Sequence, residues 1–268
     1  MSDDVPAETF YEPLGDGRFA STLATAGPWS PGLQHGGPVA ALLGRAFERH
    51  DPVPGTRVAR VTVEILNPVP VAELDVAVRV VRPGRRIAHL EGEITHEGRT
   101  VVRASAWRIM EAPSSLEPVV HAPAPPPLPG GTPPFGRWED MHVHGYLAAM
   151  EWRLVRGSFG EPGPGTVWAR SRIPLVAGER DTPLVRTLTV ADSASGVASQ
   201  LDFGKWLIIN TDMTVALHRD PAGEWLCMDA ALDASPGGSA LCTASVADPA
   251  GDFGRVLQTL LVDERRSE

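Results

Sequence analysis

Residues 36–48 read GGPVAALLGRAFE, and this stretch decides the fold of the first half of the chain. Pro38 suits the first turn of a helix, where its missing N–H has no intrahelical partner to lose. The small residues of the stretch fall on more than one helix face, while the two leucines and Phe47 add apolar bulk. A helix that is apolar nearly all round is a buried helix. The stretch therefore predicts a helix over residues 39–48 that other structure encloses closely.

A β-rich region follows this helix. Its segments are rich in valine, alternate in places, and are bounded by turn signals such as Asn67-Pro68 and Glu97-Gly98. The spacing of these signals is typical of an antiparallel meander, and we expect the sheet to curl around the helix. The predicted strands are Arg57–Val69, Glu73–Arg82, Arg86–His96 and Thr100–Met110.

The second half of the chain repeats this order of elements. We predict its helix over Ala191–Leu201, with Asp192 or Ser193 as the N-cap. Two opening strands, Ala148–Arg156 and Thr166–Ile173, precede that helix. The strands predicted after it are Trp206–Leu217, Glu224–Ala234, Ala240–Asp248 and Gly254–Val262.

Two pairs of short motifs align the halves. Thr62-Val63 corresponds to Thr214-Val215, and Gly98-Arg99 corresponds to Gly254-Arg255, with separations that differ by about four residues. A repeated α+β unit predicts two similar modules pressed together, each helix wrapped by an antiparallel sheet and the two sheets joined edge to edge. Sites tend to form between such modules.

A proline-rich segment separates the halves. Residues 111–136 read EAPSSLEPVVHAPAPPPLPGGTPPFG, which suits neither a helix nor a central strand. The Pro125–Pro127 run is typical of an extended, semi-rigid spacer. We therefore predict an N-terminal module over residues 1–112, a linker over 113–136 and a C-terminal module over 137–268.

The composition excludes several classes of protein. With 268 residues, 43% of them hydrophobic, the chain can bury one large core or two small ones. No apolar run approaches the roughly 18 residues of a membrane span. The acidic residues after Met1 leave no basic region for a secretory signal, so we expect a cytoplasmic protein without membrane insertion. The net charge of −9 argues against a nucleic-acid partner, which would require a basic stripe.

The cysteines and histidines do not point to a bound metal. Cys227 and Cys242 lie in predicted strands, where buried free thiols are the preferred interpretation and a disulfide is the alternative. His142 and His144 alternate along a strand, but no third ligand of evident spacing accompanies them. We therefore expect neither a metal nor a redox cofactor.

Three segments carry a resemblance to a known family: Gln34–Ala46 (QHGGPVAALLGRA), Asn210–Arg219 (NTDMTVALHR) and Gly254–Leu261 (GRVLQTLL). Through them the chain resembles the acyl-CoA thioesterases of the thioesterase II type, and the resemblance covers nearly the whole chain. It implies an α+β double hotdog fold in which the two modules share one continuous sheet. It also implies hydrolysis of fatty acyl thioesters carried by coenzyme A or by an acyl-carrier protein. Further association into a homo-oligomer is expected as well.

The resemblance also implies the catalytic residues. In that family a hydrogen-bonded Asp, a Thr or Ser, and a Gln orient and activate water. Asp192 and Gln258 match the Asp and the Gln, whereas Asn210 stands where the family has its hydroxyl residue. The neighbouring Thr211 should point to the opposite face of the strand.

The chemistry of thioester hydrolysis suits these residue types. The reaction needs a positioned water, a base, and donors aimed at the developing oxyanion. Asp192 can act as the base, while the amides of Asn210 and Gln258 can hold the water.

The start of the first helix offers groups for the substrate. Backbone N–H groups at Gly36 and Gly37 can polarise the thioester carbonyl, because a helix start leaves its first N–H groups without intrahelical partners. His35, just before them, can contact the phosphate or the carbonyl of the substrate. No Gly-x-Ser-x-Gly motif occurs, which argues against a serine nucleophile of the α/β-hydrolase kind.

Simpler interpretations remain open for each residue. An Asp that opens a helix is most often only an N-cap, Gln258 could face solvent on an alternating strand, and Asn210 could be a structural amide. Two other functions also remain open. One is a non-catalytic protein that binds acyl-CoA or an acyl carrier, and the other is a hotdog dehydratase or hydratase. The latter usually needs a histidine on the central helix, and neither predicted helix contains one.

Overall fold

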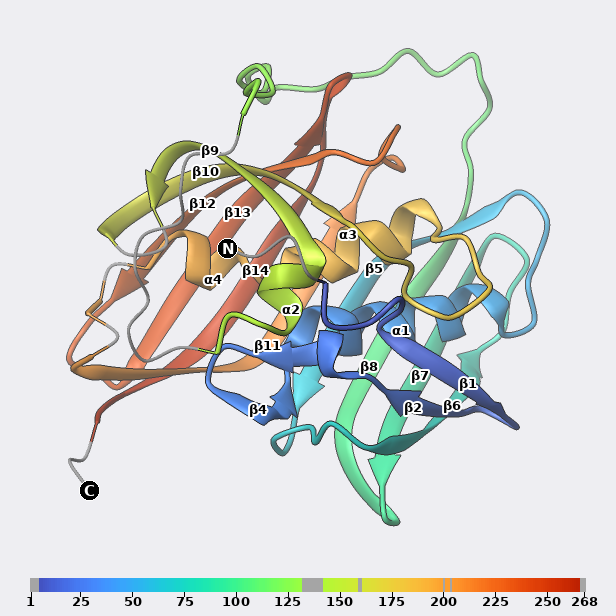
Figure 1. Ribbon diagram of the computed structural model, residues 1–268. Coiled ribbons are helices and arrows are strands. Elements are labelled where there is room, and N and C mark those ends of the chain that lie inside the picture. The colour runs from blue at the N-terminus through green and yellow to red at the C-terminus, as the bar shows by residue number, and fades with distance from the viewer. Residues whose placement is uncertain (1–4, 132–141, 159–160, 200, 203, 266–268) are drawn as a thin grey trace.

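The computed structural model describes residues 5–131, 142–158, 161–199, 201–202 and 204–265. Its first half contains a long helix followed by a β-meander, as predicted (Figure 1). The elements of this half are β1 (Tyr11–Gly15), β2 (Arg18–Ser21), η1 (Leu23–Thr25), β3 (Ala26–Gly27), β4 (Ser30–Gln34), α1 (Gly36–Arg49), β5 (Thr56–Ile65), β6 (Glu73–Arg82), β7 (Ile87–His96) and β8 (Arg99–Met110).

The second half repeats the order with a divided helix. Two strands precede that helix and a four-stranded meander follows it, again as predicted. The elements are α2 (Tyr146–Ala149), β9 (Met150–Ser158), β10 (Glu161–Ser171), α3 (Pro183–Ala191), α4 (Ala194–Val197), β11 (Trp206–Leu217), β12 (Leu226–Ala234), β13 (Ser239–Asp248) and β14 (Gly251–Glu264).

The strands of both halves form one antiparallel sheet. Its 12 strands run in the order β1-β2-β6-β7-β8-β5-β11-β14-β13-β12-β10-β9. The two halves meet where β5 pairs with β11, and the order of strands outward from this seam is the same on either side. Thr62 and Thr214 face each other across the seam, with their hydroxyl oxygens 3.0 Å apart. The predicted architecture, two helix-and-sheet modules that share one continuous sheet, is confirmed.

The alignment of the second pair of motifs is wrong. Thr62 pairs with Ser105 in the first half and Thr214 pairs with Leu257 in the second, and 43 positions separate the partners in both cases. Gly98 lies in the tight turn between β7 and β8 with φ +75°, whereas Gly254 lies inside β14. The repeat therefore needs no insertion here, and Gly98-Arg99 and Gly254-Arg255 only resemble each other in sequence.

The predicted helix over Ala191–Leu201 is also wrong, because α3 begins and ends earlier. Thr182 caps α3 through a 3.2 Å hydrogen bond to a backbone N–H of the first turn, and Pro183 occupies that turn. Asp192 therefore ends α3 instead of opening a helix. Ser193 does precede the short α4, but its side chain makes no capping bond.

The strands predicted after each helix are all present. β11 has the predicted bounds, whereas β5 ends at Ile65 and not at Val69. The Asn67-Pro68 signal explains the early end, because proline has no N–H to donate to the ladder. The N–H of Asn67 instead donates to the carbonyl of Val101 at 3.1 Å.

The two long helices pack against each other on one face of the sheet (Figure 1). This contact was not predicted, because we expected each helix to be enclosed by its own sheet. At Gly37 an added Cβ would lie 2.3 Å from the carbonyl oxygen of Thr189. Since that atom belongs to the backbone of α3, only glycine allows the start of α1 to approach so closely. The start of α1 therefore lies against the end of α3.

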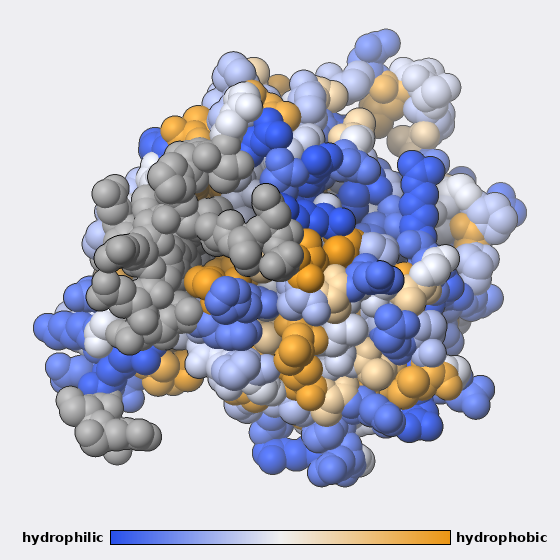
Figure 2. Space-filling view, viewed as in Figure 1, coloured by the Kyte–Doolittle hydropathy of each residue, from blue (hydrophilic) through white to orange (hydrophobic). Residues whose placement is uncertain are grey.

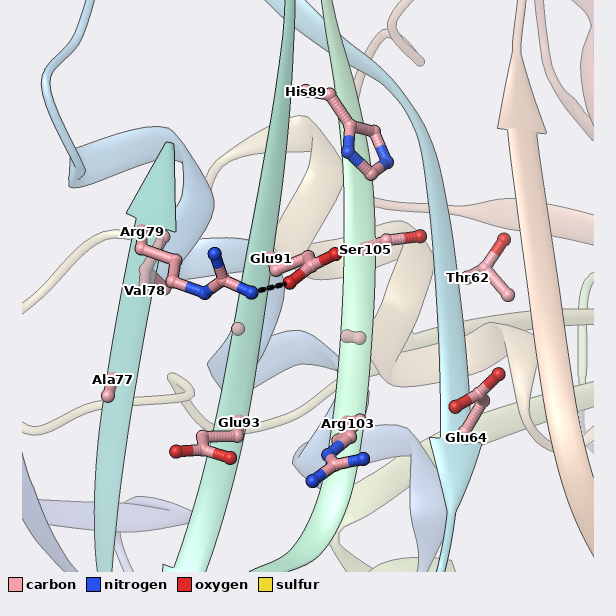
Figure 3. Close-up of a pocket in the computed structure, with 12 residues that line it drawn as sticks. Thr62, Glu64, Ala77, Val78, Arg79, His89, Glu91, Glu93, Arg103 and Ser105 are labelled. Carbon is pink, nitrogen blue, oxygen red and sulfur yellow. Dashed lines mark hydrogen bonds and ion pairs between the residues drawn. The ribbon is translucent and has the colours of Figure 1, made fainter. Parts of the chain in front are cut away.

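The opposite face of the sheet differs between the halves, since β11, β13 and β14 expose Ile209, Leu241, Leu257 and Leu261, whereas charged side chains gather on β5 to β8. It bears a hollow of about 610 Å³ lined by charged side chains of β5 to β8, and an ion pair joins Arg79 and Glu91 within it (Figure 3). On the face drawn in Figure 2, apolar side chains form separate small areas between hydrophilic ones. The continuous apolar core lies between the sheet and the helices and includes residues of both halves.

The described part of the linker runs without a helix or strand from Glu111 to residue 131. Its proline-rich end contacts the second half, since Trp168 Nε1 donates to the Pro126 carbonyl at 3.1 Å and Arg153 donates to the Pro129 carbonyl at 2.7 Å. Residues 132–136 of the predicted linker lie outside the described residues, so the module boundaries stay predictions.

Asp248 joins the turn between β11 and β12 to the turn between β13 and β14 through hydrogen bonds. Its side chain is fully buried, and its two oxygens accept hydrogen bonds from Arg219 at 2.7 and 2.8 Å. Backbone N–H groups of Ala222 and Ala250 also donate to it. Burial opposes ionisation, but Arg219 and these N–H groups outweigh it and hold the pKa of Asp248 below its usual value.

Both cysteines are free and buried, which confirms free thiols over a disulfide. Burial raises the pKa of Cys227 and of Cys242 to about 12, and the negative charges of Asp229 and Asp192 respectively add to this. Such thiols hold their protons near neutral pH and make poor nucleophiles.

Candidate active site

Asp192 lies at the junction of α3 and α4, with its carboxylate against the start of α1. Its side chain is only 10% exposed. A Cβ added at Gly36 would lie 2.7 Å from Oδ2 of Asp192, so the carboxylate reaches the helix start only because residue 36 is glycine. The start of a helix favours negative charge, and the carboxylate lies where that effect is strongest.

Two strand amides hold this carboxylate. Asn210 on β11 donates from Nδ2 to Oδ1 of Asp192 at 2.6 Å. Gln258 on β14 donates from Nε2 to the same Oδ1 and to the backbone carbonyl of Asp192, both at 3.2 Å. Gln258 is 0% exposed, so the interpretation that it faces solvent is wrong. The structure thus brings together the three residues that the sequence predicted as catalytic.

A β-bulge orients Asn210. The pairing of β11 with β14 shifts between Asn210 and Asp212, which leaves Thr211 as the extra residue. Thr211 is exposed and donates to the carbonyl of Thr259 at 2.8 Å, so it points away from Asp192 as predicted. Asn210 points inward, and its Oδ1 is buried without a hydrogen-bond partner among the described residues.

Gln258 also fixes the start of α4. Its Oε1 accepts a hydrogen bond from the backbone N–H of Ser195 at 3.0 Å. Both ends of the amide are therefore engaged with protein groups. Gln258 positions Asp192, and its Oε1 has one further acceptor position.

His35 is the N-cap of α1 and lies beside Asp192. Its Nδ1 accepts a hydrogen bond from the backbone N–H of Gly37 at 3.1 Å and lies 3.2 Å from Oδ2 of Asp192. The Gly37 N–H is therefore engaged by His35 and is not free to polarise a substrate carbonyl, contrary to the prediction. The imidazole stacks on the ring of Tyr146, with centroids 3.8 Å apart and planes within 9°. The predicted site residues at the start of α1 and those of the second half therefore form one cluster.

Tyr146 is a member of this cluster that the sequence did not predict. Its hydroxyl donates to the Thr189 carbonyl at 2.7 Å, so the Ser193 hydroxyl, 2.9 Å away, must donate to Tyr146. The tyrosine lies on α2, whose four residues carry no periodic pattern, and no local signal pointed to it.

Models of the acyl-CoA thioesterase N-terminal domain and of the acyl-CoA thioesterase C-terminal domain match residues 25–109 and 117–262. The chain belongs to the acyl-CoA thioesterase family. This membership confirms the resemblance seen in the sequence and identifies the protein as a thioester hydrolase. No match was found among curated protein sequences.

Solved structures share the fold at low identity. A tesB protein of Mycobacterium avium subspecies paratuberculosis is 18% identical, with a TM-score of 0.67 over 94% of this chain and 96% of the other. An acyl-CoA thioesterase II from Mycobacterium marinum is 18% identical, with a TM-score of 0.66 over 96% of both chains. A hot dog fold protein from Alicyclobacillus acidocaldarius is 19% identical, with a TM-score of 0.74 over 98% of both chains. These similarities confirm the double hotdog fold of this acyl-CoA thioesterase.

Although the fold of this thioesterase is duplicated, the described residues of the first half do not repeat the Asn210 and Gln258 amides. The register across the seam places Val58 at the position of Asn210 and Ala106 at the position of Gln258 in the first half. Val58 and Ala106 are both buried in the core. Apolar side chains cannot position a carboxylate or a water, so the equivalent position in the first half lacks the polar groups of the site.

Burial shifts the pKa of two titratable side chains in this cluster, His35 and Tyr146. Burial lowers the pKa of His35, and the negative charge of Asp192 opposes part of that effect. Burial raises the pKa of Tyr146, so its hydroxyl remains protonated and can donate. His35 is therefore neutral at neutral pH, with a single ring proton.

A metal site requires several ligating side chains close together, and a membrane-spanning helix must be long and apolar. Within the described residues, no group of three or more His, Cys, Asp or Glu side chains could hold a metal ion. The rings of His142 and His144 lie 6.1 Å apart in an edge-on arrangement. No helix in the described part of the chain is both long and apolar enough to cross a membrane.

Proposed function

We propose that this acyl-CoA thioesterase hydrolyses its substrate with a water activated by Asp192. One observation carries the proposal. Oδ1 of Asp192 accepts hydrogen bonds from Asn210 and Gln258, while Oδ1 of Asn210 stays buried without a partner among the described residues. A water beside this pair has two acceptors, a carboxylate and an amide oxygen, for its two O–H groups.

Asn210 can do the work of the hydroxyl residue that the family resemblance implies. A hydroxyl donates to the carboxylate and accepts from water through one oxygen, whereas the amide divides these tasks between Nδ2 and Oδ1. The 2.6 Å bond to Asp192 already fixes the amide plane. Asn210 therefore aligns the water, and Gln258 holds the carboxylate from the other side.

In the proposed reaction Asp192 is the only base, because it takes one proton from water and later returns it to the leaving thiolate. The water oxygen attacks the thioester carbonyl carbon while Asp192 takes one water proton, and the carbonyl electrons move onto the oxygen. We assign the stabilisation of that oxyanion to the backbone N–H of Gly36 at the start of α1. Collapse of the intermediate breaks the C–S bond, and the thiolate takes the proton from Asp192. The products are a carboxylic acid and a free thiol.

The substrate class follows from the family, whose model is named for acyl-CoA. We propose a fatty acyl thioester of coenzyme A, or the same acyl group on an acyl-carrier protein, which presents the same phosphopantetheine thioester. A contact between His35 and the phosphate or carbonyl of the substrate stays a prediction, as does the cytoplasmic location.

Thiol release from a panel of short- to long-chain acyl-CoA esters tests the proposal. Asp192→Asn keeps the shape of the side chain but removes the base, so kcat should fall by about 10²- to 10⁴-fold without loss of folding. Asp212→Asn is the matched control, because Asp212 lies past the bulge on the same strand and makes no contact with Asp192 in the structure. Acyl-CoA binding without turnover by the unmodified protein would favour the non-catalytic alternative instead.

A further inference from the structure

We propose that the outer face of β9, β10 and β12 is a recognition site for a proline-rich peptide, and that the chain's own linker occupies it. This face lies opposite to the helices. Val167 and Ala169 of β10 belong to the main core under the helices, whereas Trp168 between them belongs to a separate small cluster. The occupant is the proline-rich end of the described linker, residues 122–129. The proposed hydrolysis uses none of these groups.

The linker lies on this face with the three-residue period of a polyproline II helix. Proline fixes φ near the value of that helix, which has three residues per turn. Every third residue of the segment is exposed, namely His121, Ala124, Pro127 and Gly130. Over the last two turns the other four residues are half-buried, namely Pro125, Pro126, Leu128 and Pro129. The segment therefore presents one edge to solvent and two edges to the protein, as a bound polyproline II ligand does.

Two side chains bind carbonyl groups that are one turn apart. Trp168 Nε1 donates to the carbonyl of Pro126 at 3.1 Å, and Arg153 Nη1 donates to the carbonyl of Pro129 at 2.7 Å. These acceptors are three residues apart, which is about 9 Å along a polyproline II helix. Trp168 and Arg153 are direct partners across β10 and β9, so one row of the sheet supplies both donors. Carbonyl groups are what such a helix offers for recognition, because proline has no backbone N–H.

An aromatic surface surrounds the two donors. Leu128 packs against a cluster that includes Trp168 and Cys227. Trp225 packs against the same cluster, and the Arg153 guanidinium lies over its ring, 4.6 Å from the centroid. With the linker in place Trp168 is only 1% exposed. Grooves lined by aromatic side chains are the usual binding surface for polyproline II ligands, and this site has both the aromatic lining and the donors for the carbonyl groups.

Binding of a free peptide to a protein with an emptied site tests the proposal. The probe is a fluorescent peptide with the sequence of residues 120–131, VHAPAPPPLPGG. The site is emptied in the full chain by four substitutions, Pro125→Gly, Pro126→Gly, Pro127→Gly and Leu128→Ser. This linker variant should bind the peptide at least about tenfold more tightly than the unmodified protein, whose attached linker competes at a high effective concentration.

Two tryptophan substitutions in the linker variant locate the bound peptide. Trp168→Phe keeps an aromatic ring but removes the Nε1 donor, so it should weaken peptide binding by about fivefold. Trp107→Phe is the matched control, because Trp107 lies on a strand of the first half and packs beside His89. A linker variant that is folded by circular dichroism but does not bind the peptide would overturn the proposal. Equal binding of a peptide with glycine in place of every proline would overturn it as well.

Thiol labelling of single variants tests the docked linker without emptying the site. Cys227 is 3% exposed in the cluster that Leu128 covers, whereas Cys242 is 0% exposed in the main core. Leu128→Ser should raise the labelling rate of Cys227 by about five- to tenfold, because the linker loses an apolar contact with that cluster. Leu116→Ser is the matched control, since Leu116 is 68% exposed in the same linker, and Cys242 is the internal control. An unchanged Cys227 rate in Leu128→Ser would overturn the proposal.

Discussion

Replacing Gln258 by glutamate tests the contact between β14 and Asp192. Gln258 is fully buried, and its Nε2 lies 3.2 Å from Oδ1 of Asp192. Gln258→Glu keeps the length of the side chain and the acceptor for Ser195, but it places a second carboxylate oxygen where the donor was. The change therefore alters charge at almost constant volume.

The distance sets the expected magnitude. Two unit charges 3.2 Å apart repel by about 5 kcal/mol at an effective dielectric constant of about 20. This repulsion raises the pKa of the introduced carboxyl from about 4.3 to about 8. At pH 7 the folded variant therefore binds a proton that the unfolded chain does not, which costs about 3–4 kcal/mol of unfolding free energy.

The sign of the pH dependence follows from the same pKa. Because the folded value lies above the unfolded one, the variant should be nearly as stable as the unmodified protein below pH of about 4. The difference should then grow by about 1.4 kcal/mol per pH unit until about pH 8.

Urea unfolding from pH 4.5 to 8 measures this difference. Thr259→Glu is the control, since Thr259 is the next residue on β14 and its side chain is exposed. Its introduced carboxyl should leave the unfolding free energy nearly unchanged over this range. A destabilisation of Gln258→Glu that stays constant with pH would refute the close contact with Asp192.

Three further predictions concern other contacts. Asn210→Thr should keep or raise kcat in the thiol-release assay, because a hydroxyl can both donate to the carboxylate and accept from water. A fall in kcat of more than about tenfold would contradict the proposed role of this position. Asp248→Ala should lower the unfolding free energy by about 3 kcal/mol at pH 7, because it removes the carboxylate partner of the Arg219 guanidinium. The pKa of Asp248 in the folded protein lies below its usual value, so this loss should shrink as the pH falls through that lowered pKa. Urea unfolding at pH 7 and pH 3 measures the loss. A loss of equal size at both pH values would contradict the prediction. Gly37→Ala should lower the unfolding free energy by about 1–3 kcal/mol, because its Cβ would meet backbone, whereas Gly130→Ala, with open space around it, should change little in the same measurement.

The sequence alone determined most of the β-structure and the first helix. Valine alternation and Gly, Pro and Asn turn signals are local, so the predicted strands agree with β6 and β11 at both ends. The apolar composition of residues 36–48 likewise predicted a buried α1, and every residue of its first two turns from Gly37 is buried. These features follow from the short-range periodicity of the sequence, which can be read without knowing which other elements a strand or helix packs against.

The second helix shows where local reasoning failed. Asp192 and Ser193 look like N-caps, but Thr182 with Pro183 starts the helix, ten residues before Asp192. The Thr-Pro signal is present in the sequence, but the prediction placed the N-cap at Asp192 or Ser193. Asp192 consequently has its predicted neighbours but a different structural position, at the end of a helix.

The tertiary structure decided how the site is assembled. The predicted trio was chosen by family resemblance, yet only the pairing of β11 with β14 and the bulge at Thr211 turn Asn210 and Gln258 toward one carboxylate. Tyr146 joins through a stack on His35 that no sequence pattern encodes. Such contacts join residues far apart in the chain, and their geometry depends on strand register and on the packing of α1 against α3. Local propensity determined the elements of this protein, whereas sheet register and helix packing determined which of its polar groups meet.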